Sequence, residues 1–266
     1  MSREDLVSAL RKIQLTGMAE ALDHQLASPT KQKLSFSERL TELIEAERAQ
    51  RADARVLRFL RSSRIAQPCS LGGLDFASTK GVRRAEILEV ANCRWIEMHQ
   101  NTIVTGPTGI GKSYLAVALA REAVLRDFST QYFKLPALMD RLRSEEDRGT
   151  LPKFRQRLIS TKLLVLDDFL VEPLSTRDAQ QLRRVIDMRR PHASILVVSI
   201  HPVEAWHERI EDETLADSIL DHLVQGAYRF DMHGPSKRGK ATASTPDGVG
   251  ASKGMDAKLR SAIRPR

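Results

Sequence analysis

The residues best suited to chemistry form a glycine-rich run, GPTGIGKS, at positions 106–113. This run matches the phosphate-binding pattern G-x-x-x-x-G-K-[ST], in which glycines let the backbone approach phosphates closely. Lys112 supplies a mobile cation for the terminal phosphates, and the Ser113 hydroxyl suits Mg²⁺. The apolar run TIVT precedes the pattern and an amphipathic run follows it, a context that a chance glycine-rich turn would lack. We therefore predict ATP and Mg²⁺ as cofactors, with nucleotide contacts from Gly106, Pro107, Thr108, Gly109, Ile110, Gly111, Lys112, Ser113 and Tyr114.

Two adjacent carboxylates follow a second apolar run, in KLLVLDDF at 162–169. Ligands of open α/β sheets bind at the carboxyl ends of the strands, where this pair would emerge. We predict that Asp167 holds the metal together with Ser113, and that Asp168 polarises the attacking water. For either acid taken alone, the alternative is that it caps the following turn.

A third polar residue, Ser199, lies near the end of the apolar run SILVVSI at 194–200. In ATPases of this kind, a polar side chain at the corresponding strand end contacts the γ-phosphate or the water. We therefore group Ser199 with Lys112 and Asp168 as candidate catalytic residues. The alternative is that Ser199 simply ends a strand.

These residues need an α/β scaffold, and the alternation of strands and helices after residue 100 predicts a parallel sheet covered by helices on both faces. The expected strands are 102–105, 130–134, 163–166, 195–199 and 227–232. The expected helices are 112–126, 136–146, 151–160, 177–189 and 214–225. One strand–helix unit separates the glycine-rich loop from the acid pair in sequence, and we expect their two strands to be adjacent in the sheet. By analogy with known families, and not from geometry, that arrangement with an acid after the metal-binding Asp favours hydrolysis of ATP over the chemistry of small-molecule kinases, which usually position a second substrate.

The first hundred residues have helical spacing of their apolar positions. A long helix is expected from about Phe36 to Arg64, with Ser37 as its N-cap and with Pro68 and the glycines at 72–73 after its end. We divide the chain into an all-helical N-terminal domain at 1–70, which binds DNA or a partner, and an ATPase domain at 71–236. The rest, 237–266, is expected to be a disordered basic tail because it has few large apolar residues.

A stripe of arginines on the long helix is the candidate DNA contact. Steps of three or four residues place them on one slowly drifting face, where they would neutralise phosphates of double-stranded DNA. The alternative is a solvated face paired with Glu45, Glu47 and Asp53. The stripe consists of Arg48, Arg51, Arg55, Arg58, Arg61 and Arg64.

Composition limits the class of protein. The 266 residues carry a formal net charge of +8, and no apolar run is long enough for a membrane span, so no membrane partner is expected. The charged start does not suit a signal peptide, and two cysteines are too few for a disulfide framework, so we expect a cytoplasmic protein with reduced thiols.

The net charge is unevenly distributed along the chain, at +3 for residues 1–100, -1 for 101–236 and +6 for 237–266. The near-neutral middle leaves polyanion binding to the two ends.

Taken together, the stretches QNTIVTGPTGIGKSYLAVALAREA, KLLVLDDF, HPVEAWHERIEDETLADSILDHLVQGAYRF and GPSKR resemble the IstB family of insertion-sequence ATP-binding helpers. That family belongs to the AAA+ initiator clade and is similar to the DnaC helicase loader. The resemblance covers roughly residues 5–238. It implies an AAA+ core, ATP-dependent self-association on duplex DNA and delivery of that DNA to a partner transposase. We expect ATP hydrolysis that is stimulated by assembly on DNA, and that is slow because of the first departure described next.

Two departures from the family pattern bear on hydrolysis. This chain has His222 where the family usually has an Arg that resembles a finger reaching a neighbour's γ-phosphate, and Ile200 where Gln is common. Arg209, Arg229 or Arg238 is then a candidate substitute for the finger. Two alternatives stay open, a DnaC-like helicase loader and a weakly hydrolysing, nucleotide-stabilised DNA scaffold.

Overall fold

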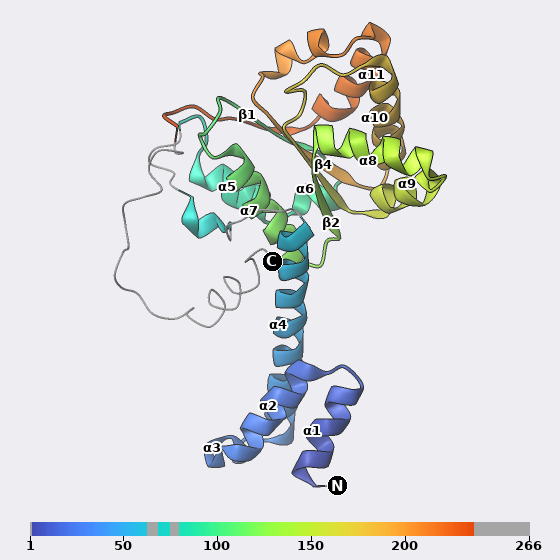
Figure 1. Cartoon of the computed structure of the whole chain (residues 1–266). Helices are drawn as coiled ribbons and strands as arrows, with labels where there is room; N and C mark the ends of the chain where they lie inside the picture. Colours follow the sequence, from blue (N-terminus) through green and yellow to red (C-terminus); the bar gives the residue numbers. More distant parts are fainter. Residues whose placement is uncertain (1, 63–68, 75–79, 237–266) are drawn as a thin grey trace. The chain divides into compact units, whose positions relative to one another are not determined.

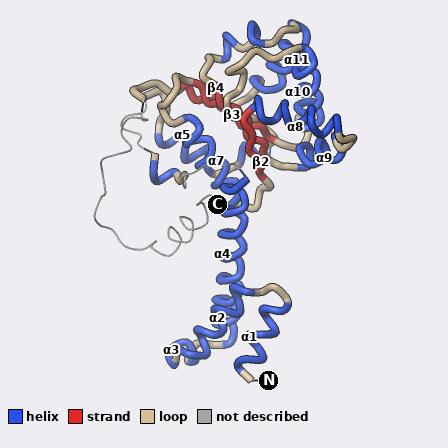
Figure 2. Tube along the Cα trace, viewed as in Figure 1, coloured by secondary structure: helices blue, strands red, loops and turns tan. Residues whose placement is uncertain are grey.

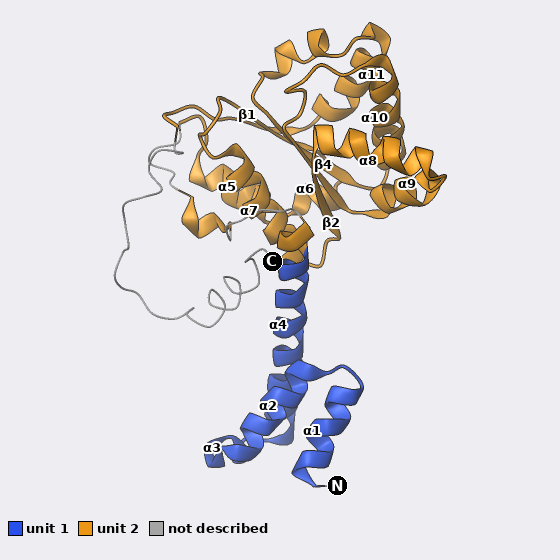
Figure 3. Ribbon diagram, viewed as in Figure 1, with its two compact units in different colours: residues 1–58 blue, residues 59–266 orange. Residues whose placement is uncertain are grey.

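The computed structural model describes residues 2–62, 69–74 and 80–236 of the chain. The chain forms two compact units, residues 1–58 and residues 59–266 (Figure 3). The expected basic tail at 237–266, Arg64 and Pro68 lie outside the described residues. None of the described helices is both long enough and apolar enough to cross a membrane.

The first unit is helical, as the spacing of apolar residues predicts. It contains α1 (Arg3–Lys12), α2 (Thr16–Ala27), α3 (Pro29–Gln32) and most of α4 (Phe36–Ser62). Helix α2 lacks a side-chain cap of its own, and the buried Glu47 of α4 serves instead, because its carboxylate accepts the backbone N–H groups of Gly17 and Met18 at 2.8 and 3.1 Å. A Cβ added to Gly17 would lie 2.7 Å from the Glu47 Cα atom, so glycine permits this close approach of the two helices.

The start of α4 differs from the prediction. The helix begins at Phe36, and Ser37 lies inside its first turn. Ser35 caps it instead, since its backbone N–H and its hydroxyl donate to the Glu38 carboxylate at 2.8 and 2.7 Å, and the Glu38 N–H donates back to the Ser35 hydroxyl at 3.3 Å. The prediction of Ser37 was therefore wrong by two residues, because Glu38 pairs reciprocally with the residue three positions before it.

The second unit is built on a five-stranded parallel sheet with the strand order β2-β3-β4-β1-β5 (Figures 1 and 2). The strands are β1 (Thr102–Thr105), β2 (Thr130–Lys134), β3 (Leu163–Asp167), β4 (Ser194–Ser199) and β5 (Tyr228–Asp231). These bounds agree with the expected strands to within a residue or two. The α/β fold with helices preceding the sheet is thereby confirmed.

One expectation about the sheet was wrong. The strands that precede the glycine-rich loop and the acid pair, β1 and β3, are not adjacent, because β4 pairs in parallel with both of them. The residue at the end of β4, Ser199, is therefore placed between the two chemical elements. The chain order of the strands does not reveal this, since β4 comes last of the three in sequence.

Helices cover both faces of the sheet, as expected. Helices α5 (Arg84–Ala91) and α7 (Lys112–Leu125) lie on one face (Figure 1). The other face is covered by α8 (Leu135–Asp147), α9 (Leu151–Ser160), α10 (Thr176–Arg189) and α11 (Glu213–Val224). The short helix α6 (Arg94–Glu97) and three 3-10 turns, η1 (Leu71–Gly73), η2 (Val203–Ala205) and η3 (His207–Arg209), complete the described part.

Alternation along the strands explains this layering. Leu164 and Leu166 belong to the apolar core beneath α8–α11, whereas Leu163 and Val165 are equally buried but lie outside that cluster. Successive side chains of a strand point to opposite faces, so a strand covered on both sides is apolar throughout. All five residues of β3 are buried, and its carboxyl end delivers Asp167 and Asp168 at the rim of the sheet.

Candidate nucleotide-binding site

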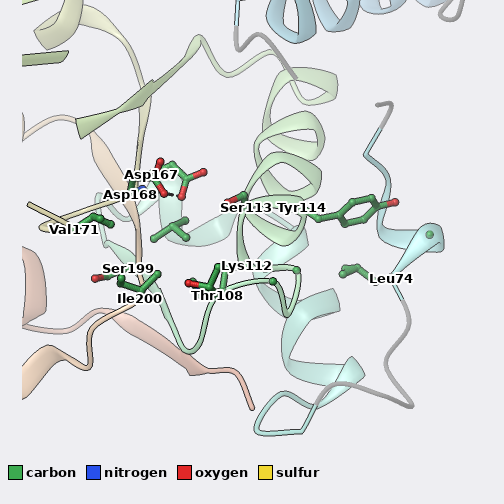
Figure 4. Close-up of a pocket in the computed structure, with 14 residues that line it drawn as sticks. Leu74, Thr108, Lys112, Ser113, Tyr114, Asp167, Asp168, Val171, Ser199 and Ile200 are labelled. Carbon is green, nitrogen blue, oxygen red and sulfur yellow. Dashed lines mark hydrogen bonds between the residues drawn. The ribbon is translucent and has the colours of Figure 1, made fainter. Parts of the chain in front are cut away.

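The glycine-rich loop and the acid pair meet in one cavity of about 470 Å³ at the carboxyl ends of β1, β3 and β4. Figure 4 shows Asp167 and Asp168 on one side, Tyr114 and Leu74 on the other, and Ser113 between them. Within the second unit, the cavity is lined by Gly73, Leu74, Thr108, Gly109, Gly111, Lys112, Ser113, Tyr114, Asp167, Asp168, Val171, Val198, Ser199 and Ile200.

Three of the nine residues predicted to contact the nucleotide do not line the cavity. Gly106, with φ +137°, makes the turn behind the loop, and an added Cβ would lie 2.1 Å from the Met232 carbonyl oxygen. Ile110 is buried next to it, and Pro107 is exposed. These residues shape the loop, while the other six predicted residues face the cavity.

The loop delivers positive charge to the cavity in two ways. Helix α7 begins at Lys112, so its free N–H groups and the positive end of its dipole lie at the cavity. The Lys112 side chain is itself only 6 % exposed, and its Nζ atom donates to the Pro107 carbonyl at 2.8 Å. The arrangement suits a polyphosphate.

The acid pair occupies two different environments. Asp167 is 2 % exposed, and its carboxylate accepts the Asp168 N–H at 2.8 Å and the Tyr132 hydroxyl at 2.5 Å. Asp168 is more open, and its Oδ2 atom lies 2.7 Å from the Nζ atom of Lys134. The backbone of Asp168 has φ +52°, a conformation that costs energy for a residue other than glycine and that concentrates at functional sites.

Tyr132 and Lys134 were missed by sequence reasoning. Both lie on β2, which pairs in parallel with β3 so that Lys134 is opposite Asp167. Burial, followed by the nearby Asp167 carboxylate, raises the pKa of Tyr132 above its ordinary value, so the hydroxyl stays protonated and donates. Their spacing was a signal, because residues two apart on a strand point to the same face of the sheet. The sequence does not show, however, which strand lies beside β2 and therefore which side chains share that face.

The wall opposite the acid pair was also missed. It consists of Gly73 and Leu74, which precede the sheet in sequence. Tyr114 of α7 holds this segment, because its hydroxyl donates to the Ser70 carbonyl at 3.1 Å and accepts the Ser70 N–H at 3.3 Å. An added Cβ on Gly73 would lie 2.2 Å from the Tyr114 hydroxyl, so a larger residue would displace either the tyrosine or this segment.

Ser199 lines the cavity, but its only proton is engaged. The side chain is buried, and its hydroxyl donates to the Phe169 carbonyl at 2.8 Å while accepting the His201 N–H at 3.1 Å. In this conformation the hydroxyl fixes the turn that follows Asp168. Ile200, the departure from the family pattern, is its neighbour in the cavity wall.

Residues beyond β4 hold the same turn from the other side. Arg209 donates to the carbonyl of Leu170 and, at 2.5 Å, to that of Val171. The fully buried Trp206 packs against Phe169 with a ring-centroid distance of 4.8 Å. Arg209 is therefore engaged within its own chain, which weakens its candidacy as a finger for a neighbour.

Comparison with known proteins decides the family. Residues 8–245 match the family model described as IstB-like ATP binding protein. The chain belongs to the IstB-like ATP-binding protein family. The insertion sequence ATP-binding protein y4pL of Sinorhizobium fredii is 34% identical over 229 residues, which are 86% of this chain and 94% of that protein. The IS5376 ATP-binding protein of Geobacillus stearothermophilus is 27% identical over 236 residues, covering 89% and 94%.

Solved structures agree on the fold. DnaI matches with a TM-score of 0.55 and 19% identity over 68% of this chain and 94% of that one. The replication initiator DnaA bound to AMPPCP and single-stranded DNA matches with a TM-score of 0.51 and 20% identity, over 63% and 51%. The IstB-like chain thus has an AAA+-type α/β fold and is an ATP-binding protein.

The residue that replaces the expected finger of the IstB-like chain lies far from its own phosphate loop. The backbone carbonyl of His222 accepts the side-chain N–H of Asn101, which precedes β1, whereas the loop follows β1 at its other end. The His222 ring nitrogen Nδ1 lies 2.8 Å from a carboxylate oxygen of Asp187 on α10. Arg229 is exposed on β5, and Arg238 is outside the described residues.

The arginine stripe of the IstB-like chain lies along the second half of α4. Arg48, Arg51, Arg58 and Arg61 are exposed and Arg55 is half-buried, while Arg64 is outside the described residues. Arg51 pairs with Glu47 at 2.7 Å, as the alternative of a paired face predicted. The described part of the chain shows no ion pair for Arg48 or Arg58.

Proposed function

We propose that this IstB-like protein is an ATP-dependent DNA-binding ATPase that assembles on target DNA and assists a transposase. The observation that supports this most is the single cavity in which Lys112, Ser113, Asp167 and Asp168 meet at the carboxyl ends of the strands. The curated relatives named as insertion sequence ATP-binding proteins favour transposition over helicase loading.

Magnesium fits the donors of this cavity. The Ser113 hydroxyl and the Asp167 carboxylate offer hard oxygen atoms, and no group of three or more His, Cys, Asp or Glu in the described part could hold a metal alone. Mg²⁺ characteristically takes one or two protein oxygens and completes its shell with water and substrate phosphates. When bound, it would neutralise charge that develops on the phosphates.

The protein residues then have separate tasks in hydrolysis. Lys112, already buried at the loop, would exchange the Pro107 carbonyl for phosphate oxygens. Asp168 is the open carboxylate of the pair and would orient the attacking water, for which its oxygen has to be shared with Lys134 or released from it. The glycine-rich loop supplies backbone N–H groups at the end of α7.

DNA binding is assigned to the exposed arginines of α4. Such a stripe contacts phosphates without reading sequence, so binding would depend strongly on salt. The place of His222 is compatible with self-association, because a group at the amino ends of the strands could reach a phosphate only in another copy of the chain. Nucleotide bound between two copies would favour an oligomer on DNA, and hydrolysis would release it.

The test is binding of duplex DNA on filters with ATP, with ADP and without nucleotide. We expect clearly tighter binding with ATP, and Lys112→Ala should lose that difference because it removes the phosphate cation. Lys153→Ala, at an exposed lysine of α9, is the matched control and should behave as the wild type. Equal affinity in all three nucleotide states would defeat nucleotide-gated assembly.

A catalytically silent scaffold is the second candidate, and two observations favour it. His222 stands in place of the expected arginine, and the Ser199 proton is engaged by the Phe169 carbonyl. The two functions differ in turnover. Phosphate release that rises on addition of duplex DNA supports the ATPase, whereas ATP-dependent DNA binding without phosphate release supports the scaffold.

A further inference from the structure

Tyr132 contacts Asp167 of the acid pair and does not line the cavity. We propose that Tyr132 is a positioning residue for magnesium, whose hydroxyl fixes the Asp167 carboxylate so that an unused lone pair faces the cavity. This inference rests on the proposed nucleotide and magnesium site. It adds a residue that the glycine-rich and acidic motifs do not contain.

The contact is well suited to fixing a carboxylate. The hydroxyl oxygen of Tyr132 lies 2.5 Å from the Oδ2 atom of Asp167, within the range of a charge-assisted O–H···O⁻ bond. Both side chains are buried, at 8 % and 2 % exposure, so water competes little for either partner. Pairing of β2 with β3 sets Tyr132 opposite Val165, two positions before Asp167, and this register fixes the tyrosine ring from the backbone.

The second oxygen of the same carboxylate is also held. The Oδ1 atom of Asp167 accepts the backbone N–H of Asp168 at 2.8 Å. A carboxylate has about four lone-pair sites, so one bond at each oxygen leaves capacity at both. Two donors at two different oxygens define the plane of the group, whereas a single donor would leave it free to rotate.

Removal of the hydroxyl should therefore affect the metal more than the fold. Tyr132→Phe keeps the ring and its packing but leaves Asp167 with one of its two donors. A group that orients a metal ligand from outside the coordination shell typically changes metal affinity by about 10- to 100-fold when it is removed. Tyr132 is not among the residues that line the cavity, so metal-free nucleotide binding should persist.

The experiment measures binding of a non-hydrolysable ATP analogue to the full chain, first in EDTA and then at increasing Mg²⁺ concentration. We expect Tyr132→Phe to raise the Mg²⁺ concentration of half-maximal effect by about tenfold and to leave the affinity in EDTA unchanged. Tyr228→Phe is the matched control, because Tyr228 lies on β5 at the opposite edge of the sheet, and its midpoint should equal that of the wild type.

A double-mutant cycle adds the readout that separates positioning from structure. In an Asp167→Asn background, Tyr132→Phe should cause no further change of the Mg²⁺ midpoint, because its effect acts through that carboxylate. A Tyr132→Phe midpoint equal to that of Tyr228→Phe would overturn the inference, and so would equal weakening in EDTA. A wild-type chain that binds the analogue without any Mg²⁺ dependence would instead overturn the proposed magnesium site itself.

Discussion

The Nζ atom of Lys134 lies 2.7 Å from the Oδ2 atom of Asp168, so the open member of the acid pair is neutralised by a cation from the neighbouring strand. The pair is partly exposed, with 61% of the lysine side chain and 37% of the aspartate side chain accessible. Exposed ion pairs of this kind contribute at most about 1 kcal/mol. The pair therefore restrains Asp168 without locking it.

Loss of this cation should increase basal hydrolysis. We expect Lys134→Met to raise the rate of phosphate release without DNA by up to about fivefold, since releasing the carboxylate from an exposed ion pair recovers up to about 1 kcal/mol. Arg177→Met breaks a similarly exposed pair with Glu146, at 66% and 39% accessible side chain, and serves as the control because neither residue lines the cavity. A decreased rate for Lys134→Met would show that the lysine helps Asp168 to act and does not restrain it.

The glycines that precede the sheet allow a sharp test of the cavity wall. Gly73→Ala would place a Cβ 2.2 Å from a Tyr114 hydroxyl that is tied to Ser70 by two hydrogen bonds, so the wall or the tyrosine has to move. We expect weaker ATP binding by about tenfold, the equivalent of one displaced contact of about 1.4 kcal/mol. Titration of the protein into a fluorescently labelled ATP analogue measures this affinity.

The neighbouring glycine supplies the control for this substitution. A Cβ on Gly72 would have its nearest atom, the Ser70 hydroxyl oxygen, 4.0 Å away. Gly72→Ala should therefore bind ATP as the wild type does. Equal loss of affinity in both variants would mean that the segment needs glycine for backbone freedom and that the contact with Tyr114 is unimportant.

The sequence alone was sufficient for the bounds of the strands and for the glycine-rich loop, because each depends on local pattern. Uninterrupted apolar runs mark buried strands such as β3, and the motif at 106–113 includes five of the six predicted contacts that face the cavity. Contacts between distant segments were not predictable. Tyr132, Lys134 and Gly73 approach the site only through strand pairing and the path of the chain before β1, and neither leaves a signal in local spacing.

The order of strands illustrates the same limit. Apolar patterns identify β1, β3 and β4, but β4 lies between the other two although it follows both in the chain. The error about Ser37 had another origin, since two serines lie near the start of the helix and only the reciprocal pair of Ser35 with Glu38 identifies the cap. Long-range strand pairing therefore determined the order of the strands, and reciprocal hydrogen bonding determined the N-cap of α4. Residue type alone predicted neither.

Glu47 should give the first unit a stability that depends on pH. Burial alone would raise the pKa of this carboxyl, but Arg51 and the N–H groups of Met18 and Gly17 outweigh burial and hold the pKa below its ordinary value. A carboxyl whose pKa is lowered by folding stabilises the folded state above its unfolded pKa, and this stability is lost as the pH falls through the folded value. We expect Glu47→Gln to be less stable than the wild type at neutral pH.

The difference should shrink as the pH falls below about 4, because the wild-type carboxyl is then also protonated. Thermal unfolding of both chains from pH 7 down to pH 3 measures it, and comparison of the two chains cancels the other carboxyls with lowered pKa values. Glu45→Gln changes an exposed glutamate on the same helix and should match the wild type. A difference that does not depend on pH would point to lost packing and away from the ionised carboxylate.

The arginines of α4 make a quantitative prediction about salt. Each phosphate contact contributes about 0.9 to the slope of log affinity against log salt concentration on duplex DNA. Replacing both Arg48 and Arg58 with alanine should therefore reduce the slope by about two and weaken binding equally for unrelated sequences. Arg183→Ala, which removes a partly exposed arginine of α10 that pairs with Asp187, is the control and should leave the slope unchanged. An unchanged slope for the double variant would assign DNA binding to another surface and leave the stripe as a solvated face.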